Sequence, residues 1–250
     1  MSMQSNPIRF ATISEIQIDD CASWTDQVFI TLDIDWAHDQ VISHAIDVLE
    51  KRDIAATWFV THQTFMLDRL RENPKFELGI HPNFNFLLQG DTRNGVDARD
   101  VIQRLMDIVP DAKAVRSHSM TRSSVLTDLF AQFGLTHDVN QFIPHSSGMS
   151  LKPWKMWHNL VSIPYFWEDD IACLYGDQTC ISEVMDCSGL RVFDFHPIHL
   201  YLNTEDLKRY EQTRSIHQQP KELWGERFVG YGTCDILTRL INMSLGHGIQ

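Results

Sequence analysis

Residues 28–36 read Val-Phe-Ile-Thr-Leu-Asp-Ile-Asp-Trp, an apolar and β-branched run that ends in two carboxylates. Such a run is typical of a buried strand. Because residues i and i+2 of a strand point to the same face, we expect Asp33 and Asp35 to project together. Two carboxylates this close repel each other, which favours protonation of one of them or a cation beside them. The alternative is an Asp-rich turn in which one Asp caps a helix that begins near His38.

Strand and helix patterns alternate after this stretch, and two long polar segments interrupt them. This alternation predicts an α/β domain with a parallel sheet or a barrel. We expect strands at residues 55–61, 76–81, 112–116, 135–139, 160–167 and 190–195, helices at 38–52, 63–72, 97–109, 123–133, 204–210 and 233–245, and loops at 82–95 and 140–155.

Composition excludes some classes of partner. The net charge of −12 leaves no basic face for nucleic acid, which proteins bind by displacing counterions from phosphates. No apolar run reaches the length of a membrane span, so we expect no transmembrane segment. The first residues contain neither the basic nor the apolar region of a secretory signal, and we therefore expect a cytoplasmic protein.

Polar side chains recur at the predicted carboxyl ends of the strands, the edge at which parallel sheets and barrels build their sites. Histidine, carboxylate and amide ligands together suit zinc or another divalent transition metal. His81 and Asn85 are four residues apart, so on one helical turn both could reach one ion, although Asn85 could instead cap a turn. The residues at these strand ends are Asp33, Asp35, His81, Arg116, His118, Asp138, Asn140 and His196.

Several of these segments, in this order, resemble motifs of the NodB-homology polysaccharide deacetylases, carbohydrate esterase family four. Among the branches of this family, the chain most resembles the WbmS-type deacetylases associated with O-antigen assembly. Residues 31–35 resemble the family's Thr-Phe-Asp-Asp motif, and residues 77–81 (Glu-Leu-Gly-Ile-His) resemble its metal motif. The further similar segments are 56–60 (Ala-Thr-Trp-Phe-Val), 114–119 (Ala-Val-Arg-Ser-His-Ser), 134–140 and 195–197 (Phe-His-Pro).

The resemblance implies a fold and a set of roles. The fold is a distorted (β/α) barrel of about seven parallel strands, in one domain over residues 1–250 with its motifs in 28–200 and terminal helices in 204–250. One divalent transition metal, with zinc as the first candidate, is bound by Asp35 and His81. The catalytic roles fall to Asp33 as general base, His196 as general acid, Arg116 as the partner that orients Asp33, and the Ser119 backbone N–H as oxyanion donor.

The chain departs from the family pattern at two positions. Asn85 stands where the family has a second metal-binding histidine, and we take it as the third ligand, with His118 or His38 as substitutes. His118 stands where the family has proline, and we place it with Ser119, Trp36, Trp167 and His199 among substrate contacts. Residues 168–170, Glu-Asp-Asp, either match an acidic family motif or form a solvated turn, and we favour the turn.

The function implied is removal of an N-acetyl group from a sugar or glycan precursor in O-antigen or lipopolysaccharide biosynthesis. Two alternatives stay open. An allantoinase-like enzyme would hydrolyse another C–N bond, and a non-catalytic sugar-binding or scaffolding protein could have kept the barrel after acquiring Asn85.

Overall fold

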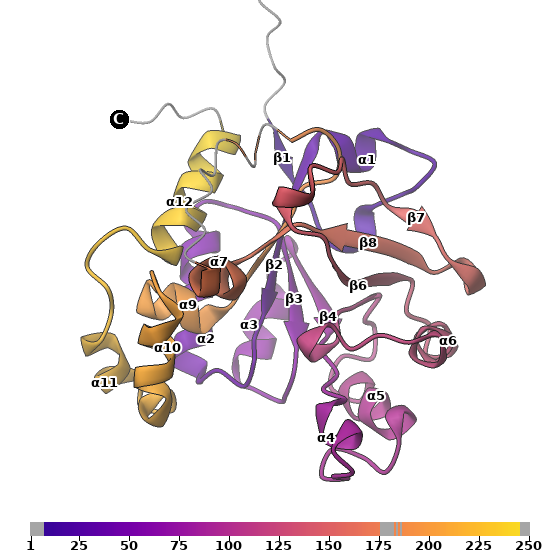
Figure 1. The fold of residues 1–250 in the computed structure, drawn as a ribbon, viewed down its shortest axis with the longest axis horizontal. Coiled ribbons are helices and arrows are strands. Elements are labelled where there is room, and N and C mark those ends of the chain that lie inside the picture. Colours follow the sequence, from indigo (N-terminus) through magenta and orange to yellow (C-terminus); the bar gives the residue numbers. More distant parts are fainter. Residues whose placement is uncertain (1–7, 176–182, 184, 186, 246–250) are drawn as a thin grey trace, which may run out of the picture.

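The computed structural model describes residues 8–175, 183, 185 and 187–245, and its centre is a ten-stranded sheet (Figure 1). The strand order is β7-β8-β6-β5-β4-β3-β2-β10-β9, with β1 also paired to β2. All neighbouring strands are parallel except β7 and β8. The strands are β1 Arg9–Phe10, β2 Gln27–Asp33, β3 Ala56–Val60, β4 Phe76–Ile80, β5 Ala114–Val115, β6 His137–Phe142, β7 Trp154–Lys155, β8 Val161–Tyr165, β9 Trp167–Glu168 and β10 Val192–Phe195.

The sheet curls into a half-barrel because β8 and β9 are consecutive in the chain but stand at opposite ends of the parallel series. Only the buried Phe166 separates them, so the chain joins the two ends of the sheet. The barrel fold expected from the family resemblance is therefore confirmed. The sheet also contains three short strands, β1, β7 and β9, that the sequence patterns did not separate.

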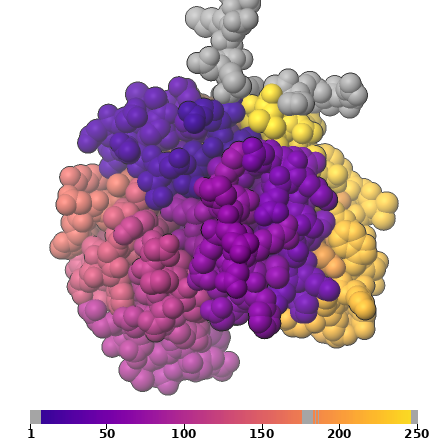
Figure 2. Space-filling view, turned by 180° about the vertical axis from the view of Figure 1, so that it is seen from behind, coloured from indigo at the N-terminus to yellow at the C-terminus, as the bar shows by residue number. Residues whose placement is uncertain are grey.

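Helices follow β2, β3, β4 and β5, as a parallel sheet requires. Helix α2 illustrates how these helices pack, because its apolar residues lie on one buried face. At its start, His38 Nδ1 caps the helix by accepting from the Gln40 N–H. Figure 2 shows the opposite face of the molecule, where the purple surface of α2 and α3 lies between the pink middle of the chain and the yellow C-terminal helices. The helices are α1 Ala22–Thr25, α2 Asp39–Glu50, α3 Met66–Glu72, α4 Asn85–Leu88, α5 Ala98–Met106, α6 Ser124–Gln132, α7 Asp169–Tyr175, α9 Pro197–Leu202, α10 Leu207–Thr213, α11 Pro220–Gly225 and α12 Thr233–Ser244.

The largest differences from the sequence prediction are three helices, α7, α9 and α11, that it lacked. Helix α9 begins with Pro197, one residue beyond the end of β10 at its N-cap His196, and all its residues are buried, with contacts to α2 and α12, so it shows no amphipathic period. Strand β6 also runs three residues further than predicted, with a shift of register between Asp138 and Gln141. Such bulges re-aim side chains, and this one lies at the carboxyl edge of the sheet. No helix in the described ranges is long and apolar enough to cross a membrane.

Gly79 tests the packing of the sheet. It lies in β4, where an added Cβ would approach both the Ala114 carbonyl oxygen and the Phe59 ring to 2.8 Å. We expect Gly79→Ala to lower the free energy of unfolding by about 1–3 kcal/mol. The reason is that the Ala114 carbonyl oxygen belongs to the backbone of the neighbouring strand and cannot move away from the added methyl group without shifting that strand. Urea unfolding measures this, with Gly225→Ala as control, since nothing lies within 4 Å of that position. Equal stability of the two variants would contradict this packing.

Candidate metal and hydrolytic site

The two carboxylates after the first long strand meet at one imidazole. Strand β2 ends at Asp33, and the chain then turns through left-handed backbone at Asp35 (φ 36°) and Trp36 (φ 55°). Asp33 Oδ2 lies 3.4 Å from His81 Nδ1, and Asp35 Oδ1 lies 3.3 Å from His81 Nε2. The two carboxylates therefore converge on His81, but not as neighbours on one strand face as predicted, because Asp35 lies in the turn after β2 and contacts the opposite ring nitrogen.

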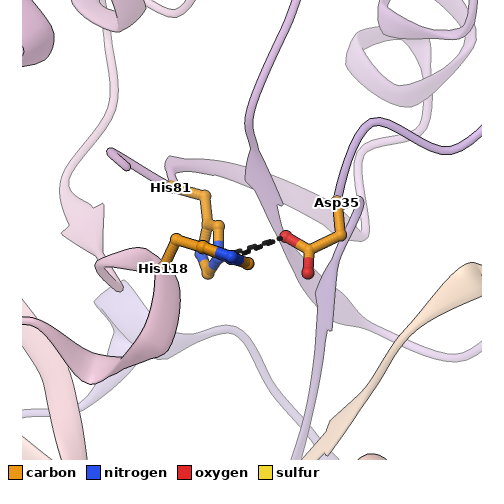
Figure 3. A group of neighbouring side chains, drawn as sticks. All are labelled: Asp35, His81 and His118. Atoms are coloured by element: carbon orange, nitrogen blue, oxygen red, sulfur yellow. Dashed lines mark hydrogen bonds and ion pairs between the residues drawn. The ribbon is translucent and has the colours of Figure 1, made fainter. Parts of the chain in front are cut away.

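Three side chains converge where Asp35 faces His81 (Figure 3). His118 Nδ1 lies 3.3 Å from Asp35 Oδ1 and 3.3 Å from His81 Nε2, so the three potential ligand atoms form a nearly equilateral triangle. Tetrahedral zinc with bonds of about 2.0–2.1 Å separates its ligand atoms by roughly 3.3–3.4 Å. The triangle therefore has the size that one such ion requires.

Electrostatics at this triangle also suit a cation. Burial alone would raise the pKa of Asp35, but the facing imidazoles of His118 and His81 outweigh it and hold that pKa well below its usual value. Burial lowers the pKa of His81, yet the charges of Asp33 and Asp35 raise it overall. Asp35 Oδ1 is buried and makes no hydrogen bond of good geometry with the described residues. An ionised carboxylate oxygen aimed at two imidazole nitrogens is a ready ligand set.

Asn85 lies outside this triangle. Its Nδ2 donates to Ser119 Oγ at 3.0 Å, and its Oδ1 accepts from Thr121 Oγ1 at 3.3 Å. The residues between His81 and Asn85 are not helical, and α4 only begins at Asn85, so the two side chains do not share a helical turn. His38, the other substitute considered, caps α2. The structure instead places His118 Nδ1 3.3 Å from both Asp35 Oδ1 and His81 Nε2.

Arg116 joins Asp33 to a second buried carboxylate. Its Nη1 donates to Asp33 Oδ1 at 3.1 Å, to Thr31 Oγ1 at 2.9 Å, and to Asp194 Oδ1. Burial raises the pKa of Asp194 to about 7, although Arg116 opposes the shift. Sequence reasoning missed Asp194, but a signal was present: Asp194 lies in β10 two residues before His196, whose backbone is still extended, so the two side chains project to the same side.

His196 is held by a buried acid. Its Nδ1 lies 2.7 Å from Asp169 Oδ1, and its backbone N–H donates to Asp169 Oδ2 at 2.8 Å. Burial lowers the pKa of His196, but Asp169 outweighs this and raises it well above the usual value. His196 Nε2 points toward the triangle, 3.7 Å from Asp35 Oδ2. The solvated turn expected at residues 168–170 is therefore wrong for Asp169, whose side chain is fully buried at the start of α7.

A cavity of about 270 Å³ opens beside these groups, and we call it the catalytic cavity. Trp36, His118 and His199 line it, as expected for substrate contacts. Trp167 does not serve this wall, because its ring packs into the core against Phe195. The sequence prediction missed the contribution of the C-terminal region, which supplies Tyr210, His217 and Gln218.

Comparison with known proteins agrees with the geometry. The profile of the WbmS-like polysaccharide deacetylases matches residues 30–214. A Bordetella bronchiseptica protein, ascribed to polysaccharide deacetylation in O-antigen biosynthesis, has a crystal structure that superposes with a TM-score of 0.88 at 40% sequence identity, covering 95% of this chain and 99% of that one. A carbohydrate esterase family four pseudoenzyme from Bacillus anthracis matches at 15% identity with a TM-score of 0.41, over 86% of this chain and 64% of that one. No curated protein matches significantly.

The profile match begins within β2 and runs beyond β10, and the Bordetella alignment covers 95% of the chain. The chain therefore belongs to the WbmS-like polysaccharide deacetylases, a family of hydrolases that act on non-peptide carbon–nitrogen bonds.

Proposed function

We propose that this protein is a metal-dependent deacetylase that removes an N-acetyl group from a sugar of a surface polysaccharide or its precursor. The observation that carries the proposal is the triangle of Asp35, His81 and His118, with Asp33 beside His81 and His196 beside Asp35. The O-antigen role ascribed to the Bordetella relative supports the choice of substrate class.

Each residue of the site has a separate role in the proposed hydrolysis. A divalent ion held by Asp35, His81 and His118 would polarise the acetamide carbonyl and make a water molecule more acidic. Asp33, oriented by Arg116, takes a proton from the attacking water as the water oxygen bonds to the carbonyl carbon. His196 gives a proton to the nitrogen as the C–N bond breaks, so that acetate and a free amine leave. The family resemblance assigns the developing oxyanion to the Ser119 backbone N–H, a contribution of about 2.7–4 kcal/mol in comparable sites.

His118 favours catalysis over the non-catalytic alternative. The substitution at Asn85 would leave only two ligands if no other side chain took the vacant role. An imidazole from another loop lies at the required distance, so the ligand set keeps two histidines and one carboxylate.

Metal content and acetate release together test the proposal. We expect purified protein to bind about one zinc or similar ion per chain and to release acetate from an N-acetylated glycan. A chelator should abolish release and added Zn²⁺ should restore it. Protein that acquires no ion and releases no acetate, while remaining folded by circular dichroism, would contradict the proposal.

Asp169→Asn should change the pH dependence. Asp169 raises the pKa of His196, and His196 is the acid only while protonated, below that pKa. Removing the negative charge lowers the pKa of His196, so the alkaline limb of the kcat profile should move to lower pH. The control is Asp128→Asn, which removes a carboxylate at an exposed position. An unshifted alkaline limb in Asp169→Asn would exclude His196 as the acid.

A further inference from the structure

Tyr210 brings a phenol from the C-terminal region to the wall of the catalytic cavity. It lies in α10, which packs against α7 and α9 (Figure 1). Helix α7 begins at Asp169, and α9 follows directly on His196 at its N-cap. The proposed acid and its buried partner therefore lie at the starts of the two helices that hold α10 in place.

Two imidazoles fix the ring of Tyr210. The ring of His199 lies tilted to it with centroids 5.1 Å apart, and the ring of His217 lies tilted to it with centroids 4.7 Å apart. His199 in turn stands edge-on to His196, with centroids 5.7 Å apart, and its Nδ1 lies 3.0 Å from Thr204 Oγ1. The orientation of the phenol is thus set through its ring, in a row of rings that leads to the proposed acid.

The hydroxyl group of Tyr210 takes no part in fixing the ring. Within the part of the chain that the structure describes, it makes no hydrogen bond. Tyrosine hydroxyls in protein interiors usually find a partner. Here Tyr165 donates to Glu168 Oε2 at 2.9 Å, and Tyr201 donates to the Pro220 carbonyl at 2.9 Å. The Tyr210 hydroxyl is therefore available to a molecule bound in the catalytic cavity.

Electrostatics place this hydroxyl among the reacting groups and keep it protonated. Burial raises the pKa of Tyr210, and the negative charge of Asp35 raises it further. The charges of Arg214 and His196 oppose this shift without cancelling it. A phenol whose pKa exceeds its ordinary value of about 10 carries its proton at neutral pH, so it can both donate and accept a hydrogen bond.

An acetamide differs from an acetate ester in one hydrogen-bonding group beside the bond that breaks. The amide has an N–H where the ester has an oxygen without hydrogen. The leaving nitrogen must lie next to His196 to receive its proton, and an amide N–H without an acceptor there would weaken binding. Asp170 also lines the cavity, but its Oδ1 is buried. The phenol oxygen of Tyr210 has unused lone pairs at this end of the cavity.

We propose that Tyr210 is a specificity-determining residue, whose hydroxyl oxygen accepts the N–H of the bound acetamide and thereby selects N-acetyl over O-acetyl groups. The hydrogen bond also holds the nitrogen so that its lone pair, released as water attacks the carbonyl carbon, faces His196. A site built to bond a substrate N–H discriminates strongly against an analogue that lacks it. The inference rests on the proposed deacetylase function for the reaction, whereas the hydrogen bond itself is also a matter of binding.

Two probes that differ only in this group test the contact. They are the methyl glycoside of N-acetylglucosamine and the matching glucoside that carries an O-acetyl group on its second carbon. Acetate release gives kcat/KM for each, and calorimetry on zinc-loaded Asp33→Asn protein gives binding without turnover. Tyr210→Phe removes only the hydroxyl. Its matched control is Tyr231→Phe, at an exposed position outside the cavity.

The readout is the ratio of the two kcat/KM values, because esters are intrinsically more reactive than amides. We expect Tyr210→Phe to lower kcat/KM for the acetamide by about tenfold or more, and to leave kcat/KM for the ester within about threefold of wild type. Zinc content should not change, and Tyr231→Phe should behave as wild type. Binding of the acetamide should weaken in parallel, while binding of the ester does not.

Equal losses on both probes, or no loss on the acetamide, would overturn the role of Tyr210. A ratio that changed in Asp170→Asn and not in Tyr210→Phe would assign the acceptor to Asp170 instead. Acetate from neither probe in the wild-type protein would contradict the deacetylase function, and binding would then decide alone. Tighter binding of the acetamide that Tyr210→Phe removes would support the hydrogen bond, and equal or undetectable binding of the two probes would overturn it.

Discussion

His118→Ala should lower the affinity for Zn²⁺ by more than about 100-fold, because loss of an outer-shell partner alone already costs about 10–100-fold. His118 supplies one of three atoms that lie 3.3 Å apart, and the remaining Asp35 and His81 cannot complete a tetrahedral site. Acetate release should fall with metal occupancy. Competition with a fluorescent chelator measures the affinity.

Asn85→Ala is the matched control for this prediction. Its side chain bonds Ser119 and Thr121 and lies outside the triangle, so its removal should leave Zn²⁺ affinity within a few-fold of wild type. The two variants thus separate the ligand sets proposed from sequence and from structure. Loss of zinc in Asn85→Ala with retention in His118→Ala would restore the asparagine as ligand.

Asp33→Asn should reduce turnover by about 10²–10⁴-fold while the protein keeps its metal. The asparagine can still contact Arg116, but it cannot take a proton from water. Because Asp33 meets His81 at Nδ1, and the triangle uses Nε2, the ligand set should survive the change. Measurements of kcat and zinc content on the same preparation test both parts.

A matched charge-neutralising control is Asp128→Asn, at an exposed position on α6. It should leave both turnover and zinc content unchanged. If Asp33→Asn retained kcat close to wild type, another group would be the base. If it lost its metal, Asp33 would belong to the ligand set.

Much of the fold could be predicted from the stretch at residues 28–36 and the alternation after it, because buried parallel strands and amphipathic helices leave strong periodic patterns. Helix α9 left none, since it is buried on every side. The continuation of β6 past Val139 was missed because Asn140 and Gln141 are polar, and only the shift of register at that point explains how they remain in the strand.

The sequence predicted several residues that the structure brings together at the candidate site, but it placed others wrongly. Asp35, His81 and His196 converge because each follows a parallel strand, and strand ends share one edge. The prediction of Asn85 as a ligand rests on its place in the family pattern and on a helical turn after His81, but the chain there is not helical until Asn85 itself. Asp169 could not be distinguished from a solvated acid in sequence, since its burial depends on strand β10 more than twenty residues later.

The most direct test of the central claim is anomalous scattering at the zinc absorption edge from crystals grown with Zn²⁺. The structure predicts one strong peak within bonding distance, about 2.0–2.1 Å, of Asp35 Oδ1, His81 Nε2 and His118 Nδ1. The absence of a peak between these three atoms, or a peak held instead by Asn85, would contradict it.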